Sequence, residues 1–194
     1  MIKSLSLVAV CAVTVVGCDS GGSATPRRDI TPVYSKETGK LAELTSDRDG
    51  DGKVDTRAFM DGVRIQRVEI DRDKDGRPDR WEFYSANRPA DDPQLERVEE
   101  SEGADGRVVR REYYESGVIS RVDEDTDGDD RVDKWEHYER GLLSQVELDL
   151  LGRGKPTQRL VYRAGGTVER VESDPDGDGT FELVKQAVAP VAAR

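Results

Sequence analysis

The feature that most constrains this chain is an Asp-rich segment that recurs along it at a nearly constant spacing. Four of the segments keep aspartates at their first, third and fifth residues, whereas the third and fifth segments have lost most of these carboxylates. A regular spacing of this length is the sequence signature of a repeat architecture, in which each unit packs mainly against its neighbours. The segments begin 24, 30, 24, 24 and 25 residues apart, at Asp47, Asp71, Ser101, Asp125, Asp149 and Asp174.

The stretches between these segments carry a β-hairpin pattern. Each Asp-rich segment is followed by a short run of alternating residues, a small turn with glycine such as Ser116-Gly117, and a second alternating run. Alternation on both sides of a glycine turn indicates a β-hairpin. We therefore expect an all-β fold: an extended antiparallel meander of β-hairpin repeats with Asp-rich loops between the hairpins. The alternating runs are clearest at 80–84, 110–114, 134–138, 158–162, 63–70, 118–124, 142–148 and 167–173.

The segment from Asp71 to Glu82 has the composition of a calcium loop. Carboxylates stand at its positions one, three, five, nine and twelve, and Gly76 stands at position six, where a tight turn favours a residue without Cβ. Five or more protein oxygens in a flexible loop favour Ca²⁺ over Mg²⁺, which usually keeps several waters. Zinc is disfavoured because no Cys or paired His accompanies the carboxylates. The expected affinity is that of extracellular modules, with Kd on the order of 10⁻⁴ to 10⁻³ M.

The same spacing yields candidate ligands in all four acidic segments. The alternative is that these Asp-Gly sequences are plain hairpin turns with solvated acids, but four matching copies in one chain argue against it. Position twelve falls in the following strand, so Glu82 and Glu136 can point to the wrong face. The candidate metal ligands are Asp47, Asp49, Asp51, Asp55, Asp71, Asp73, Asp75, Asp79, Glu82, Asp125, Asp127, Asp129, Asp133, Glu136, Asp174, Asp176, Asp178 and Glu182.

The loop sequences resemble the calcium loops of EF-hands and the DxDxDG repeats of thrombospondin type 3 modules. The connections differ from those of an EF-hand, because about twelve residues interrupted by glycine cannot supply a helix on each side. Pro78 also lacks the backbone N–H that position eight donates in paired EF-hands. The hairpin parts are similar to those of MORN-like repeats. Only the loop ligands are therefore carried over from these resemblances.

The N-terminus indicates export and lipidation. Lys3 precedes an apolar run of about a dozen residues, which is too short to span a membrane as a helix and fits a signal peptide. The sequence Val15-Val16-Gly17-Cys18 resembles a bacterial lipobox, which implies cleavage before Cys18 and its lipidation. We expect a signal peptide at 1–17, a flexible Gly/Ser/Pro-rich tether at 18–40, the repeat domain at 41–184 and a disordered tail at 185–194. The protein would then be lipid-anchored in a bacterial cell envelope, with the membrane left open.

Composition and motifs argue against two other classes of function. The formal charge of −11 disfavours nucleic-acid binding, which needs a basic surface. The single histidine, His137, falls on an expected strand, and no Ser or Cys has a plausible His partner, so no enzyme is expected. Trp81 and Trp135 are expected to be core anchors rather than sugar platforms.

The function expected from the sequence is that of a non-catalytic, calcium-binding, lipid-anchored envelope protein that serves as a spacer or interaction surface. Two alternatives stay open. One is a hairpin-repeat module that binds a protein or a glycan and binds metal only incidentally. The other is a calcium sensor, which would need a large conformational response at micromolar calcium.

Overall fold

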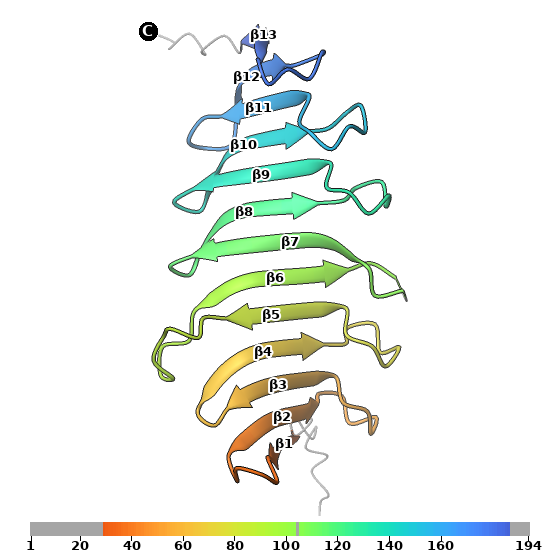
Figure 1. Cartoon of the computed structure of the whole chain (residues 1–194), viewed down its shortest axis with the longest axis vertical. Coiled ribbons are helices and arrows are strands. Elements are labelled where there is room, and N and C mark those ends of the chain that lie inside the picture. The colour runs from red at the N-terminus through yellow and green to blue at the C-terminus, as the bar shows by residue number, and fades with distance from the viewer. Residues whose placement is uncertain (1–28, 104, 187–194) are drawn as a thin grey trace, which may run out of the picture.

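The computed structural model describes residues 29–103 and 105–186, which form one sheet of thirteen strands. Every strand pairs antiparallel with the next one along the chain, so the sheet is an open meander with β1 and β13 at its edges (Figure 1). The described residues contain no helix, and hence none long and apolar enough to cross a membrane. The expected fold class is confirmed. The strands are β1 (Asp29–Tyr34), β2 (Leu41–Asp47), β3 (Thr56–Asp61), β4 (Arg64–Ile70), β5 (Arg80–Tyr84), β6 (Leu95–Ser101), β7 (Val108–Glu115), β8 (Val118–Glu124), β9 (Lys134–Glu139), β10 (Leu142–Leu148), β11 (Gln158–Tyr162), β12 (Val168–Ser173) and β13 (Glu182–Gln186).

The connections between strands lie along two opposite sides of the sheet, and these two sides differ in chemistry. Every connection from an even-numbered strand to the next odd-numbered one is an Asp-rich segment or its degenerate form, and these loops project from one side of the sheet in Figure 1. The opposite side carries the hairpin turns. At two of them both central residues have positive φ, Ser116 (51°) with Gly117 (77°) and Arg140 (53°) with Gly141 (77°). This backbone matches the strand twist, and glycine adopts it without the steric penalty of a Cβ.

A single row of valines on one face is the buried core. Val98 and Val122 are fully buried, and Val68 and Val146 nearly so. The strand register places a glutamate between successive valines, for example Glu112 between Val98 and Val122. No second layer covers this row among the described residues, so the long side chains around each valine exclude water from it.

The glutamates of this row are held by neighbours on their own strands. Glu82 accepts hydrogen bonds from Arg80 Nε at 2.9 Å and from the hydroxyl of Tyr84 at 2.9 Å. The same Arg/Lys-x-Glu-x-Tyr arrangement recurs at Glu112 and Glu136. We call these three groups the glutamate clamps; they are Arg80/Glu82/Tyr84, Arg110/Glu112/Tyr114 and Lys134/Glu136/Tyr138.

The opposite face carries Trp81, Phe83 and Trp135, as the alternation predicts. Trp81 and Trp135 lie there, half-buried between charged side chains of neighbouring strands. The expectation that they anchor the core is wrong, because the buried row belongs to the valines of the other face. In a single-layer sheet a large aromatic residue covers its cross-strand neighbours instead of filling an interior.

Two strand segments lie where the sequence predicts none. β1 falls within the expected tether and pairs with β2, although Pro32 can donate no backbone hydrogen bond. An edge strand tolerates such a residue, because only one of its sides is paired. At the other end β13 extends to Gln186, past the expected end of the repeat domain.

Candidate metal centres

The four acidic loops share one closing arrangement around their first aspartate. Counting each loop from that residue, the carboxylate at position one accepts the backbone N–H groups of positions four and six. For Asp71 these donors are Lys74 at 2.7 Å and Gly76 at 2.8 Å. The corresponding pairs of bonds, all between 2.7 and 2.9 Å, occur at Asp47, Asp125 and Asp174.

Position nine closes three of the loops from the other end. Its backbone N–H donates to the carbonyl of the residue before the loop, as from Asp79 to Ile70 at 2.9 Å. Its carboxylate accepts the N–H of position two, as from Arg72 at 2.8 Å. The loop is thereby tied at both ends before any ion is considered. The same carboxylate contacts occur at Asp55 and Asp133.

These bonds bring three carboxylates together in each acidic loop. In the first three acidic loops the group contains positions one, three and nine, and in the last it contains positions one, three and five. One oxygen from each residue of a group lies within 4.8 Å of the others. We call these groups the aspartate clusters: Asp47/Asp49/Asp55, Asp71/Asp73/Asp79, Asp125/Asp127/Asp133 and Asp174/Asp176/Asp178.

The spacing within a cluster fits calcium. Calcium–oxygen distances are about 2.3–2.6 Å, so two oxygens on one ion are at most about 5 Å apart. A carboxylate has about four lone-pair directions. The position-one aspartates use two or three of them for N–H groups and keep capacity for an ion. Three negative charges at this distance also repel one another unless a cation is near.

Some predicted ligands lie outside the clusters. In the first three acidic loops the position-five side chain instead accepts the N–H of position seven, for example Asp75 from Arg77 at 2.8 Å. Glu82 and Glu136 point onto the valine face and belong to the glutamate clamps. Glu182 lies exposed in β13. The position-twelve glutamates leave the loop because the strand that follows it turns their side chains onto the sheet. The position-five residues outside the clusters are Asp51, Asp75 and Asp129.

The degenerate loop from Asp149 to Thr157 shows which roles are structural. Asp149 still accepts the N–H of Gly154 at 2.5 Å, and the hydroxyl of Thr157 takes the place of the position-nine carboxylate, accepting the N–H of Leu150 at 3.0 Å. Leu151 and Arg153 stand where the other carboxylates would be. The loop therefore closes through positions one and nine without a cluster. The role of Thr157 was not predicted from the sequence, although it stands at position nine, where the first three acidic loops have an aspartate.

The backbone N–H groups also stabilise the charged form of the position-one aspartates. Burial raises the pKa of the Asp125 carboxyl, but the N–H groups of Gly128, Asp130 and Asp129 lower it by more, so the pKa lies below its ordinary value. Asp149 and Asp174 have lowered pKa values for the same reason. These carboxylates are therefore ionised at neutral pH.

Basic side chains from neighbouring loops reach three of the acidic loops. The ammonium of Lys74 contacts Asp49 in the preceding loop, which lowers the pKa of Asp49 and raises that of Lys74. Arg107 donates to the carbonyl of Gly128 in the following loop. Lys155 donates to the carbonyl of Gly177 at 3.1 Å. Basic groups of the chain itself thus supply part of the charge compensation of these loops.

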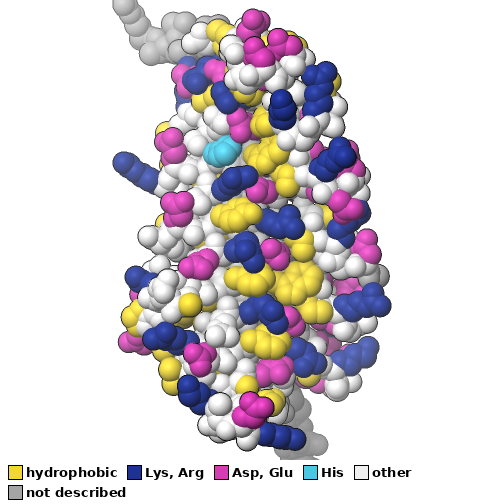
Figure 2. Space-filling view, in the orientation of Figure 1, with side chains coloured by type: hydrophobic (Ala, Val, Ile, Leu, Met, Phe, Trp, Pro, Cys, Tyr) yellow, Lys and Arg dark blue, Asp and Glu magenta, His cyan; other side chains and the backbone are white. Residues whose placement is uncertain are grey.

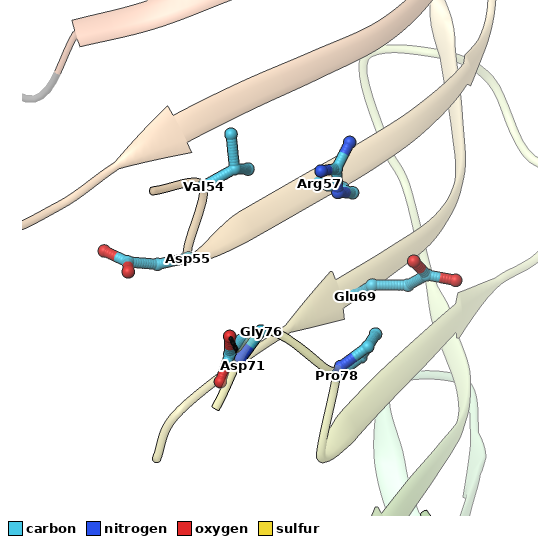
Figure 3. A pocket seen from close by; sticks show the side chains of 7 residues that line it. All are labelled: Val54, Asp55, Arg57, Glu69, Asp71, Gly76 and Pro78. Carbon is cyan, nitrogen blue, oxygen red and sulfur yellow. Dashed lines mark hydrogen bonds between the residues drawn. The ribbon is translucent and has the colours of Figure 1, made fainter. Parts of the chain in front are cut away.

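Adjacent loops are joined by their backbones. The N–H of Asp71 donates to the carbonyl of Asp55 in the preceding loop at 2.8 Å. Figure 3 shows the small hollow between these two loops. The carboxylates of Asp55 and Asp71 lie there at the ends of neighbouring strands, and Arg57 and Glu69 project over the sheet. The same backbone contact links every later pair of loops, from Ser101 to Asp79, Asp125 to Val109, Asp149 to Asp133 and Asp174 to Thr157.

The remaining predicted residues lie apart from the clusters. Nε2 of His137 is 3.1 Å from Glu147, which also pairs with Arg159 at 2.9 Å, so the histidine belongs to a charged row on the strands. Cys18, the expected signal peptide at 1–17 and most of the expected tail lie outside the described residues.

Comparisons with known proteins identify no family. No protein-family model matches the chain, and no curated protein matches it. One similar solved structure is described as the crystal structure of accessory secretory protein 1, 2 and 3 in Streptococcus pneumoniae. The two are 16% identical, with a TM-score of 0.28, over 66% of this chain and 20% of that one. This chain therefore matches about a fifth of that structure, and the TM-score does not establish a shared fold.

Proposed function

We propose that this chain is a non-catalytic, calcium-binding envelope protein, held to a bacterial membrane by lipid at Cys18, that serves as a stiff spacer or interaction surface. The observation that carries the calcium proposal is the recurrence of a three-carboxylate cluster at the same place in four repeat units. If these acids were only solvated residues of hairpin turns, three of them would not be expected to meet at ligand spacing in four separate loops. The lipid anchor is supported by the lipobox-like sequence at Val15 to Cys18.

The clusters indicate a structural role for the ion. Each would hold a cation with three carboxylates, one or two of which also close the loop, where one hairpin passes into the next. Calcium there would neutralise the repelling carboxylates and tie the loop more firmly to the strand ends. The sheet between the loops is already hydrogen-bonded throughout, so binding would stiffen it without rearranging it.

Calcium titration of the chain from residue 19 onward tests this proposal. With Kd between about 10⁻⁴ and 10⁻³ M, about 10 mM calcium should add roughly 1.4–2.7 kcal/mol per occupied site, seen as a higher melting temperature by circular dichroism. Magnesium at the same concentration should add less. A melting temperature unchanged by millimolar calcium would refute the proposal. A large change in the spectrum at micromolar calcium would instead identify a sensor.

A matched variant separates ion binding from loop closure. Asn in place of Asp at position three of all four acidic loops keeps the position-one closing bonds and removes one charge from each cluster. We expect it to melt like the native chain in EDTA and to lose most of the calcium-dependent rise. The four substitutions are Asp49→Asn, Asp73→Asn, Asp127→Asn and Asp176→Asn.

A further inference from the structure

Two of the four acidic loops are direct neighbours in the row of loops along one side of the sheet. They are the loop from Asp47 to Asp55 and the loop from Asp71 to Asp79, with four aspartates each. The other two acidic loops are separated from these and from each other by the degenerate loops. Basic side chains lie among the acidic ones along this side (Figure 2). In the described row, only the first two aspartate clusters therefore belong to adjacent loops, where like charges repel most directly.

Lys74 of the second loop extends its side chain to the first loop. Its ammonium contacts the carboxylate of Asp49, a member of the first cluster. Lys74 also lines a hollow between the two loops together with Asp55 of that cluster. The hydrogen bond to Asp49 contributes most to the raised pKa of Lys74, and the charges of Asp55 and Asp51 raise the pKa further. The first cluster thus has a positive charge of the chain itself beside it.

The position-three carboxylates of the other clusters lack such a partner. Position three of each acidic loop uses one carboxylate oxygen to accept the N–H of position five, as Asp49 and Asp127 both do at 3.2 Å. At Asp49 the second oxygen contacts Lys74. At Asp73, Asp127 and Asp176, no basic side chain of the described residues forms an ion pair with the carboxylate. The first cluster is therefore the one whose position-three ligand is already engaged by a cationic group.

The backbone at Lys74 favours glycine, yet a lysine stands there. Position four has positive φ in all four acidic loops and is glycine in three of them, at Gly50 (79°), Gly128 (80°) and Gly177 (75°). Lys74 has a φ of 65°, which costs free energy in a residue with a Cβ. Its N–H still donates to Asp71 at 2.7 Å, so the closed loop holds this side chain toward the neighbouring loop. The contact with Asp49 is a gain that offsets the cost of the backbone.

Calcium and the ammonium would compete for the same carboxylate. An ion in the first cluster takes Asp49 as one of three carboxylate ligands, so it must break the ion pair with Lys74. At the clusters that begin at Asp125 and Asp174, an ion relieves repulsion without displacing a lysine from position three. We propose that Lys74 is an internal counter-ion of the first aspartate cluster, which therefore binds calcium more weakly than those two clusters. This inference rests on the proposed calcium function.

A calcium titration of the full-length protein in non-ionic detergent, followed by NMR, measures the sites separately. In the first, third and fourth acidic loops a glycine N–H donates to the position-one aspartate, so its amide resonance reports that site. These glycines are Gly52, Gly128 and Gly179. The Gly52 midpoint should lie at a calcium concentration at least about threefold above the other two, the size of effect expected of an exposed ion pair. The second cluster is not a matched reference, because Lys74 is part of its loop and Arg72 Nε lies 4.0 Å from Asp79.

Two lysine variants make the test specific. Lys74→Met keeps a long side chain without its charge and should lower the Gly52 midpoint about three- to fivefold, with the other two midpoints unchanged. Lys155→Met is the matched control, because Lys155 also reaches a neighbouring loop but donates to a carbonyl there, that of Gly177. This control should leave the Gly52 midpoint unchanged and shift that of Gly179 by less than about twofold.

A second variant keeps the inference testable if Lys74→Met fails to fold. Lys74→Gly gives the second loop the residue that the other acidic loops have at position four, and should lower the Gly52 midpoint in the same way. Three amides that do not respond to about 10 mM calcium would refute calcium binding, and the inference with it. Responses at Gly128 and Gly179, with a Gly52 midpoint equal to theirs or lowered by neither Lys74 variant, would overturn the inference and leave the calcium proposal standing.

Discussion

The first aspartate of a loop has a structural role in addition to the metal-binding role that we propose for it. Asp149 has no carboxylate cluster around it, yet it is 8% exposed and holds the N–H groups of Leu151 and Gly154. Asp125 holds the N–H groups of Gly128 and Asp130 within a cluster. Asp127, by contrast, accepts one N–H, from Asp129 at 3.2 Å, and lies exposed. Position one therefore closes the loop and also belongs to the cluster, whereas position three contributes to the cluster without closing the loop.

Substitution at these two kinds of position should separate the effects. Asp149→Ala removes the carboxylate that accepts the N–H groups of Leu151 and Gly154 and should lower the free energy of unfolding by roughly 1–2 kcal/mol, equally in EDTA and in calcium. Asp127→Asn should change little in EDTA and reduce the calcium-dependent gain. Urea unfolding of both variants with and without calcium measures this. An Asp149→Ala defect that calcium repairs would contradict the assignment.

At the scale of residues, the spacing of carboxylates predicted the positions that lie within the loop, but not those that lie in the following strand. Positions one and three of every acidic segment lie where the calcium-loop pattern puts them. Glu82 and Glu136 do not, because position twelve already belongs to a strand whose valine face recruits them. The pattern comes from loops followed by helices, so it carries no information about side-chain direction in a strand.

The glutamate clamps hold the strands in addition to the buried valines. Burial and the hydrogen bond to Glu82 raise the pKa of Tyr84 to about 12, and burial and Glu112 raise that of Tyr114 to about 12. Each tyrosine therefore keeps its proton more firmly in the folded protein than in the unfolded chain, where its pKa is about 10. This contribution to stability is complete below pH 10 and is lost as the pH rises through 12.

The Tyr84→Phe, Tyr114→Phe variant isolates this effect. The difference in unfolding free energy between the native chain and the variant should be constant up to about pH 10 and shrink steadily toward pH 12. Urea unfolding at intervals between pH 8 and pH 12 provides the measurement, and the variant supplies the baseline for all other groups that titrate there. A difference that grows with pH would show that the clamps do not favour the protonated tyrosines.

At the scale of elements the sequence predicted the strands well because two independent signals coincide. Alternation defines 80–84, 118–124 and 142–148, and glycine turns or Asp-rich loops end them, so the observed β5, β8 and β10 have the same bounds. β1 has neither signal in full, since Pro32 and the surrounding Ser, Thr and Gly residues suggest a tether. Its pairing depends on the free edge of β2, which no local pattern reveals.

The whole molecule is a row of nearest-neighbour contacts. Each strand touches only the strands before and after it in the chain, and each loop is bonded to the loop before it. The sequence period predicted this organisation. It did not reveal that the guanidiniums of Arg67, Arg97 and Arg121 lie over aromatic rings of the preceding strands. Cross-strand partners depend on register, and register depends on turn geometry that a single sequence specifies only loosely.

Such a row should open from its ends. We expect backbone hydrogen exchange to be slowest in β6 to β8, which contain Val98 and Val122, and progressively faster toward β1 and β13. Calcium should slow exchange most in the acidic loops and the strand ends beside them. Exchange followed by mass spectrometry resolves these segments. Uniform protection from β1 to β13 would mean that the sheet unfolds as one unit instead.

The meander also defines a length that can change only in steps. One repeat unit contributes two strands, so its removal or duplication would alter the long axis by roughly 10 Å while leaving the direction of the chain and the identity of both faces intact. Loss of a single strand would instead reverse the chain and exchange the acidic edge for the turn edge. The length of a protein built this way can change during evolution only by whole hairpins.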